Sequence, residues 1–281
     1  MSNKTVFDII NLVIKLSKLN IKIVFFDIDG TLTNSNKVMT KNTIKTLNRL
    51  IDNNIYIVLC SGRINSYIKD YLKLINKSKY TISNNGALIY DNELNKVIIS
   101  HKLYNKDLEY LWDYSNKNNS SFIINTINNK YANKFVNDKE DKTIINNINE
   151  IKEDKLQLVI SNKDINVMKE LENYINNKTD LKVINKSFDY LNEVKNGYYF
   201  FDIVNNNINK GTAIKYLLKV LNINKENSIC FGDSINDIEM FNSVGISVAM
   251  KNSIEEIKNI ADYITDTNDN DGISTFCNKY L

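Results

Sequence analysis

Two short acidic motifs in this sequence each follow an apolar run and could bind a metal or carry phosphoryl chemistry. DIDGT at 27–31 follows IKIVFF, and GDSIND at 232–237 follows SICF. Ligands of open parallel sheets bind beyond the carboxyl ends of the strands. Carboxylates that meet there repel each other, and a divalent cation relieves the repulsion. Because oxygen ligands favour a hard cation, Asp27 and Asp233 together predict a Mg²⁺ site.

Each motif alone also has a simpler interpretation. An Asp-x-Asp after a strand is often a helix cap or a turn, and the same holds for a single G-D-x-x-N-D segment. The two motifs occur in one chain, each directly after a run that is apolar enough for a buried strand. Their combination favours the metal site over two unrelated caps.

Two further segments could complete an anion-binding site. Ser61 and Gly62 follow the apolar run IYIVLC, and a hydroxyl and an amide at such a turn can hold phosphate oxygens. Lys210 begins a predicted helix and could neutralise phosphate as a point charge. The alternatives are an ordinary capped turn for Ser61 and a solvated surface position for Lys210.

The composition argues against several other kinds of active site. A single histidine, His101, argues against Ser-His hydrolases, histidine phosphatases and multi-histidine zinc sites. The eight glycines lie too far apart for a dinucleotide or P-loop motif. Cys60, Cys230 and Cys277 form no C-x-x-C pair. Cys60 and Cys230 lie in apolar runs, so we expect small buried hydrophobes and a reducing, cytoplasmic location.

The charge pattern predicts a solvated surface. The net charge is +3, from 36 basic and 33 acidic residues, and the lysines are interleaved with acids, so we expect no nucleic-acid binding. Apolar residues between Val6 and Leu19 recur at helical spacing and predict an amphipathic helix. Asp8 and Lys15 interrupt them, so we expect no membrane span. We expect this helix to pack on the protein; a partner-binding or membrane-surface helix is the alternative.

The hydrophobic pattern up to residue 86 predicts strands that alternate with helices. Nearly continuous apolar runs at 21–29 and 55–60 are typical of strands that are buried on both faces. We expect helices over 41–53 and 64–76 and a short strand over 80–83. This order implies right-handed crossovers and an α/β fold with a doubly wound, mainly parallel, Rossmann-like sheet.

The pattern changes between residues 87 and 205. Two short strands predict a hairpin, and helical patterns near 104–117, 139–151 and 163–177 alternate with strand-like segments. The first pattern resumes with a helix from Lys210. We therefore expect a core in two pieces with an inserted α/β domain. The expected division is a helical extension over 1–20, a core of 21–86 and 206–281, and an insert over 87–205.

The motifs together resemble the haloacid dehalogenase-like (HAD) phosphatase superfamily. Its D-x-D-G-T-[LV] motif is matched at 27–32, its Ser or Thr by Ser61, its lysine by Lys210 and its G-D-x-x-N-D motif at 232–237. SNNGALIY, NKGTAI and GDSINDIEM resemble the Cof-type subfamily. The insert lies between the second and third motifs, which is similar to a class-II cap, and its strand–helix alternation is similar to subclass B.

The resemblance implies roles for the matched residues. Asp27 would be the nucleophile that forms an aspartyl-phosphate, and Asp29 would act as general acid and base. Mg²⁺ would be held by Asp27, the backbone carbonyl of Asp29 and Asp233. The phosphoryl oxygens would be held by Ile28, Ser61, Gly62, Lys210 and Asn236, with Thr31, Arg63 and Asp237 in supporting positions.

The sequence therefore predicts a Mg²⁺-dependent phosphatase that acts on small phosphorylated metabolites, in particular sugar phosphates. We expect a monomer or homodimer. One alternative is a phosphotransferase similar to phosphomannomutase, which would pass the phosphoryl group to a sugar instead of water. The other is a non-catalytic regulatory or scaffold protein that uses its N-terminal helix.

Overall fold

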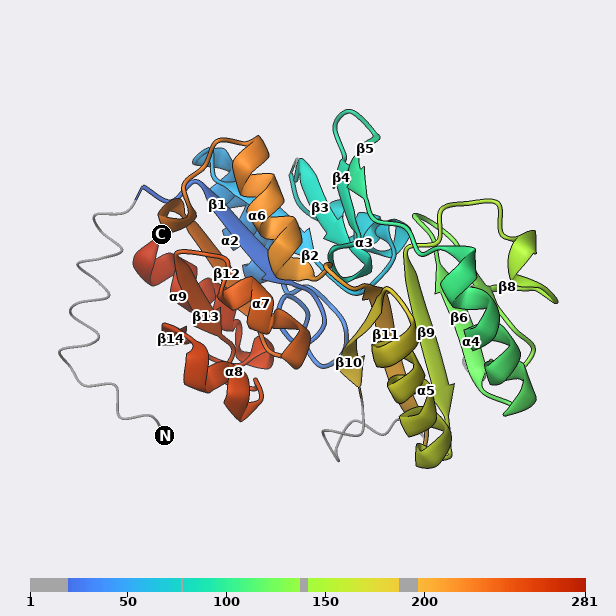
Figure 1. The fold of residues 1–281 in the computed structure, drawn as a ribbon. Coiled ribbons are helices and arrows are strands. Elements are labelled where there is room, and N and C mark those ends of the chain that lie inside the picture. Colours follow the sequence, from blue (N-terminus) through green and yellow to red (C-terminus); the bar gives the residue numbers. More distant parts are fainter. Residues whose placement is uncertain (1–19, 77, 137–140, 187–196) are drawn as a thin grey trace.

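The computed structural model describes residues 20–76, 78–136, 141–186 and 197–281 (Figure 1). The amphipathic helix expected before residue 20 lies outside these ranges. The described chain forms two sheets, one of eight strands and one of six. No helix in these ranges is long and apolar enough to cross a membrane.

The eight-stranded sheet is the core, and its central strands are parallel as expected. These strands are apolar throughout because both of their faces are covered. In spatial order the strands are β14 (Tyr263–Ile264), β13 (Ile246–Ala249), β12 (Ser228–Gly232), β1 (Ile23–Asp27), β2 (Tyr56–Cys60), β3 (Tyr80–Ser83), β4 (Leu88–Asp91) and β5 (Lys96–Ser100).

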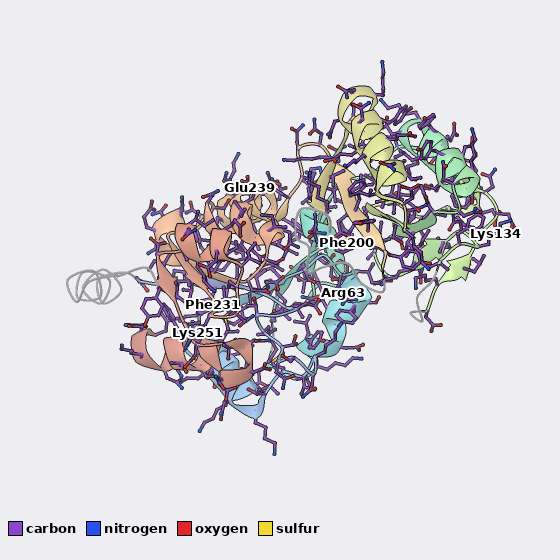
Figure 2. All side chains as sticks on the ribbon, turned by 90° about the horizontal axis from the view of Figure 1, so that it is seen from below. Arg63, Lys134, Phe200, Phe231, Glu239 and Lys251 are labelled. Carbon is purple, nitrogen blue, oxygen red and sulfur yellow. The ribbon has the colours of Figure 1, made fainter. Side chains whose placement is uncertain are left out.

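Helices cover both faces of the core sheet, which confirms the doubly wound fold. Val24 and Phe26 of β1 pack in one apolar cluster with residues of α2, α3 and α9, while Ile23 and Phe25 pack on the opposite face with residues of α6, α7 and α8. Phe231 lies inside the first cluster (Figure 2). The helices are α2 (Lys41–Asp52), α3 (Asn65–Leu72), α6 (Lys210–Val220), α7 (Ile238–Phe241), α8 (Glu255–Ile260) and α9 (Gly272–Tyr280).

The six-stranded sheet belongs to the insert, which we call the cap. Its strands pair antiparallel except for β7 with β8, and residues of α4 and α5 pack in its apolar cluster. The elements are α4 (Asn105–Lys117), α5 (Ile165–Lys178), and, in spatial order, β10 (Leu181–Lys186), β11 (Tyr199–Asn205), β9 (Gln157–Asn162), β6 (Ser121–Asn125), β7 (Lys130–Ala132) and β8 (Thr143–Ile144).

The expected helix near 139–151 is wrong for the residues that the structure describes. From residue 141 the chain forms β8 and one 3₁₀ turn, Ile148–Glu150. The side chain of Asn147 accepts a hydrogen bond from the backbone of Asn149 and caps this turn. Asparagine competes with helical hydrogen bonds in this way, so an Asn-rich segment with helical spacing did not form a helix.

The predicted hairpin is present as β4 and β5, and it extends the core sheet. β4 pairs antiparallel with β3 after a tight 3₁₀ turn, Asn84–Gly86, although the sequence analysis assigned the hairpin to the insert. We therefore propose that the cap begins after Ser100. This pairing places the turn Asn84–Gly86 beside the carboxyl ends of the core strands.

Candidate active site

The two acidic motifs meet at the carboxyl ends of adjacent strands. β1 and β12 pair in parallel with Phe26 opposite Phe231, so the residues that follow them leave the sheet side by side. Carboxylate oxygens of Asp27, Asp233 and Asp237 lie within 4.8 Å of one another. The strand register therefore brings together three acids, of which the first and the last are more than 200 residues apart in the chain.

Lys210 places a buried ammonium between two of these acids. It is the first residue of α6, which Asn209 caps by accepting from the backbone of Thr212. Its Nζ donates to Oδ1 of Asp27 at 2.5 Å and to Oδ1 of Asp237 at 2.7 Å, and its side chain has no exposed surface. We call Asp27, Lys210, Asp233 and Asp237 the strand-end cluster.

The strand-end cluster carries more negative than positive charge. Burial raises the pKa of Asp27 well above its usual 3.8; the ammonium of Lys210 opposes this shift, and the carboxylates of Asp237 and Asp233 add to it. Burial and the neighbouring Asp237 raise the pKa of Asp233 to about 7. Burial alone would lower the pKa of Lys210, but the carboxylates of Asp237 and Asp27 outweigh it and raise that pKa.

The donor set of the strand-end cluster fits a divalent cation. Carboxylate oxygens are the ligands that hard cations prefer, and a cation would offset the excess negative charge. Thr31 donates to Oδ1 of Asp233 at 2.8 Å and orients it. Gly30 has φ +84°, and a Cβ there would collide with the Asp233 carboxylate. Glycine thus allows the first acidic loop to approach the second.

Asp237 fixes the second acidic loop. Its Oδ2 accepts from the backbone amides of Asp233 and Ser234 at 3.0 and 3.1 Å, while its Oδ1 accepts from Lys210. This carboxylate is fully buried. Through these hydrogen bonds it holds both Lys210 and the loop that carries Asp233.

The carboxylate of Asp29 pairs with the guanidinium of Arg63. Arg63 Nε and Nη2 donate to its two carboxylate oxygens at 3.1 and 3.4 Å, and Lys37 Nζ lies 3.9 Å away. The guanidinium also lies over the ring of Tyr67, 4.7 Å from its centroid. The Asp29 carboxyl remains 38% exposed, so water and small molecules can reach it.

Arg63 lies on the part of the core that meets the cap (Figure 2). Nearby, the backbone amide of Asn65 donates to the carbonyl of Ile127, and the hydroxyl of Ser66 donates to the carbonyl of Asn128. These bonds dock the loop between β6 and β7 of the cap against the start of α3. The cap is therefore docked two residues beyond Arg63, which pairs with Asp29.

Ser61 and Asn236 come together through a residue that the sequence analysis did not select, Asn85. The Asn85 amide donates from its backbone to the carbonyl of Ser61 at 3.0 Å, and its Oδ1 accepts from Asn236 Nδ2 at 3.0 Å. Gly62 lies against the same side chain. The Asn-Gly dipeptide at 85–86 signals a turn, but nothing in the sequence signals these long-range contacts.

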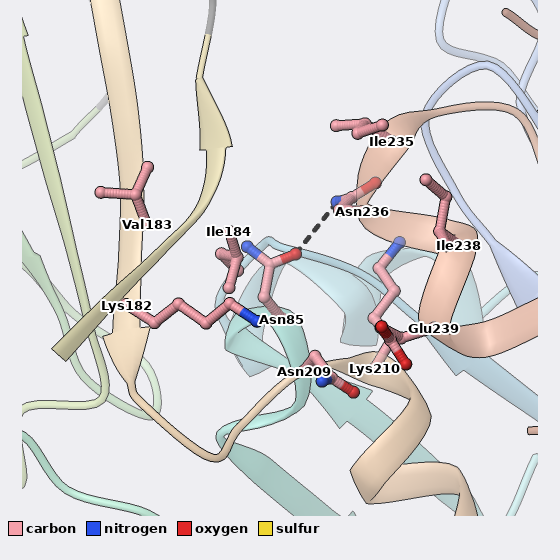
Figure 3. A pocket seen from close by; sticks show the side chains of 10 residues that line it. All are labelled: Asn85, Lys182, Val183, Ile184, Asn209, Lys210, Ile235, Asn236, Ile238 and Glu239. Carbon is pink, nitrogen blue, oxygen red and sulfur yellow. Dashed lines mark hydrogen bonds between the residues drawn. The ribbon is translucent and has the colours of Figure 1, made fainter. Parts of the chain in front are cut away.

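A pocket of about 180 Å³ opens between these loops and β10 of the cap (Figure 3). Lys210 and Asn236 line it from the core, and Lys182 and Ile184 line it from the cap. Ser61, Gly62, Asp27 and Asp233 are not among its lining residues.

The carbonyl of Ile28 accepts hydrogen bonds from the backbone amides of Leu32 and Thr33, and these bonds shape the first acidic loop. The expected residues thus form one contiguous region made of four loops.

Comparisons with known proteins show the family and the fold. Residues 24–276 match the model of a family described as haloacid dehalogenase-like hydrolase. The chain is 28% identical to the 5-amino-6-(5-phospho-D-ribitylamino)uracil phosphatase of Bacillus subtilis, over 91% of this chain and 94% of that protein. A haloacid dehalogenase-like hydrolase from Bacteroides thetaiotaomicron superposes with a TM-score of 0.81 at 26% identity, over 93% of this chain and 100% of that chain.

A solved sugar phosphatase of HAD subclass IIB has the same fold. It superposes with a TM-score of 0.75 at 22% identity, over 92% of this chain and 98% of that chain. This agrees with the core and the α/β cap that the sequence predicted.

Proposed function

The chain belongs to the haloacid dehalogenase-like hydrolases and is a phosphatase, and we propose that it hydrolyses small phosphorylated metabolites, in particular sugar phosphates, with Mg²⁺. The strand-end cluster carries this proposal. Three acids lie within 4.8 Å of one another at the carboxyl edge of the core sheet, and two of them, Asp27 and Asp237, bind the buried ammonium of Lys210. The pocket beside them is small and is closed on one side by the cap, which suits a small substrate.

The acidic residues divide into ligands and supports. Asp27, the backbone carbonyl of Asp29 and Asp233 would hold Mg²⁺, which would offset negative charge on the phosphoryl group. Asp237 serves indirectly, because its contacts with Lys210 and with the backbone of Asp233 fix the geometry around the ion. Thr31 orients Asp233.

Asp27 is the proposed nucleophile. Lys210 holds its Oδ1, so the carboxylate keeps one orientation toward the substrate. A carboxylate oxygen attacks phosphorus, the bond from phosphorus to the leaving oxygen breaks, and Asp29 gives that oxygen a proton. Water then loses a proton to Asp29 and attacks phosphorus, which breaks the bond to Asp27 and releases phosphate.

The remaining residues bind the phosphoryl oxygens. The donors would be the backbone amides of Ile28 and Gly62, the hydroxyl of Ser61, the amide of Asn236 and the ammonium of Lys210. Phosphoryl transfer depends mainly on such positioning and charge neutralisation. Arg63 supports the site by holding Asp29.

A panel of phosphorylated metabolites tests the proposal. Phosphate release should depend on added Mg²⁺ and stop with a chelator, and at least one sugar phosphate should be a good substrate. Equal rates with and without Mg²⁺ would contradict the proposal. A sugar monophosphate supplied together with its bisphosphate separates hydrolysis from transfer, because a phosphotransferase would pass a phosphoryl group from the bisphosphate to the monophosphate and so form the isomeric monophosphate, whereas a phosphatase would release free phosphate. The cytoplasmic location and the monomeric or homodimeric state stay predictions.

A further inference from the structure

Asn85 is built into the site more firmly than its place in a turn requires. Its backbone has φ 54° and ψ 32°, a left-handed conformation that asparagine tolerates better than most residues. Its side chain is fully buried. Asn85 thereby joins the loop of Ser61 to the loop of Asn236, because its backbone N–H donates to the carbonyl of Ser61 and its side-chain Oδ1 accepts from Asn236, each at 3.0 Å.

The other end of this side chain is unused by the described part of the protein. Nδ2 of Asn85 is buried and has no hydrogen-bond partner there. Asn85 lines the pocket beside Lys210 and Asn236, and its nitrogen is turned away from Asn236, toward the cap strand β10 (Figure 3). Buried donors are nearly always paired, so a donor aimed into a pocket points to an acceptor on a ligand.

The cap supplies a second donor to the same pocket. Lys182 of β10 lines it and extends toward Asn85 (Figure 3), and none of the ion pairs found among the described residues involves its ammonium. Ile184 and Ile238 add aliphatic walls. Glu239 of α7 is the one carboxylate among the lining residues.

We propose that Asn85 is a substrate-binding residue whose Nδ2 donates to an oxygen of the leaving group, with Lys182 as a second donor from the cap. The inference rests on the proposed function, because the leaving group enters this pocket when the phosphoryl group lies at Asp27. The pocket selects leaving groups that carry an oxygen acceptor near the ester, on a hydroxyl or a carboxylate. The Oδ1 of Asn85 accepts a hydrogen bond from Asn236, and this bond fixes the direction of Nδ2.

The test compares three small probes at saturating Mg²⁺. Glycerol phosphate offers hydroxyls, phosphoglycolate offers a carboxylate, and phenyl phosphate offers neither. In Asn85→Gly, kcat/KM for the preferred oxygen-bearing probe, divided by kcat/KM for phenyl phosphate, should fall about ten-fold, the usual effect of one lost hydrogen bond. The ratio separates substrate contact from structure, since a general loosening of the site lowers all three rates alike.

Asn84→Gly is the matched control. Asn84 is also buried and left-handed, with φ 49°, and glycine adopts this conformation readily. Its side chain donates to the carbonyl of Thr126 and does not line the pocket. The substrate ratio in this variant should equal that of the wild type.

Lys182→Met gives a second variant on an exposed strand position. It should lower the same ratio. Glu239→Gln tells whether the bound oxygen belongs to a hydroxyl or to a carboxylate, because Glu239 accepts from a hydroxyl but repels a carboxylate. If the wild type prefers glycerol phosphate, the variant should weaken that preference. If the wild type prefers phosphoglycolate, the variant should strengthen that preference.

Two results would overturn this inference without rejecting the proposed function. One is an unchanged ratio in both Asn85→Gly and Lys182→Met while phenyl phosphate is still hydrolysed. The other is a wild type that shows no preference for either oxygen-bearing probe. A wild type that hydrolyses none of the three with Mg²⁺ would reject the proposed function, and this inference with it.

Discussion

The strand-end cluster of the core and an exposed ion pair of the cap place charged side chains in opposite ways. In the core, Lys210, Asp27 and Asp237 are buried against one another at strand ends. In the cap, an ion pair such as Lys106 with Asp180 spans 3.0 Å with both side chains well over half exposed. Buried charges are costly to desolvate, whereas exposed pairs cost and contribute little. The difference favours the core as the place of the proposed chemistry and the cap as one wall of the pocket.

The largest effect should come from removing the buried ammonium. Lys210→Met leaves the carboxylates of Asp27 and Asp237 buried without their partner, so we expect the free energy of unfolding to fall by about 3–5 kcal/mol. Urea denaturation without added metal measures it. Turnover should be lost as well, because the orientation of Asp27 depends on Lys210. A loss of stability no larger than that of a surface variant would break the contrast between core and cap.

The stabilisation by Mg²⁺ should be smaller than the effect of Lys210→Met and should depend on pH. The pKa of Asp233 is raised from 3.8 to about 7 in the folded protein, so without metal the folded state binds this proton more tightly than the unfolded state. Raising the pH from 3.8 toward 7 therefore removes stability from the metal-free protein. A cation needs the ionised carboxylate, so the stabilisation by Mg²⁺ should grow over the same range.

Thermal unfolding with and without Mg²⁺ checks this dependence. At a concentration one hundred times its dissociation constant, Mg²⁺ should add about 2.7 kcal/mol at neutral to alkaline pH and much less under acidic conditions. Asp233→Asn should abolish the effect at every pH. An increment that is equal across the pH range would show that Asp233 does not bind the ion.

The hydroxyl of Thr31, next to the proposed metal site, should contribute less to stability than Mg²⁺ does. Thr31→Val removes the 2.8 Å hydrogen bond to Asp233 with little change in side-chain volume. We therefore expect the free energy of unfolding to fall by about 1.5 kcal/mol, which is typical for a hydrogen bond to a charged group. Weaker Mg²⁺ binding by titration should accompany it. Thr33→Val is the control, since that hydroxyl donates to the carbonyl of Ile28; it should leave Mg²⁺ affinity unchanged. Equal effects of the two variants on affinity would refute the role of Thr31.

The smallest effect should come from the surface of the cap. Lys106→Gln breaks the exposed pair with Asp180, and the free energy of unfolding should change by less than about 1 kcal/mol. Denaturation curves and the phosphatase rate should both match the wild type closely. A change as large as that of Lys210→Met would remove the distinction between the two regions.

The core was predictable from the sequence because its signals are local. Apolar runs buried on both faces end directly in acids, and so the pattern alone placed Asp27 and Asp233 on strand ends and predicted the parallel order. Lys210 was found by its place at the start of a helix. Its bonds to Asp27 and Asp237, by contrast, join residues that are distant in the chain.

Other features depend on non-local pairing and could not be predicted in this way. The two-residue strand β8 and the three-residue strand β7 are too short for any hydrophobic period. The hairpin β4–β5 joins the core only through the register of β3 with β4. Asn85 escaped notice because its bond to Asn236 spans 151 residues and requires a left-handed backbone.

The central claim is that Asp27, within the strand-end cluster, attacks phosphorus in a Mg²⁺-dependent reaction. Asp91 provides a matched control, because it is also a buried acid at a strand end of the core sheet. Its Oδ1 accepts from the backbone amides of Glu93 and Leu94, and asparagine can keep both bonds.

Phosphate release should therefore be measured with Mg²⁺ for the wild type, Asp27→Asn and Asp91→Asn on the best substrate of the panel. The account predicts that Asp27→Asn lowers kcat on the order of 10⁴-fold or more while Asp91→Asn stays close to the wild type. Equal rates for Asp27→Asn and the wild type would contradict it.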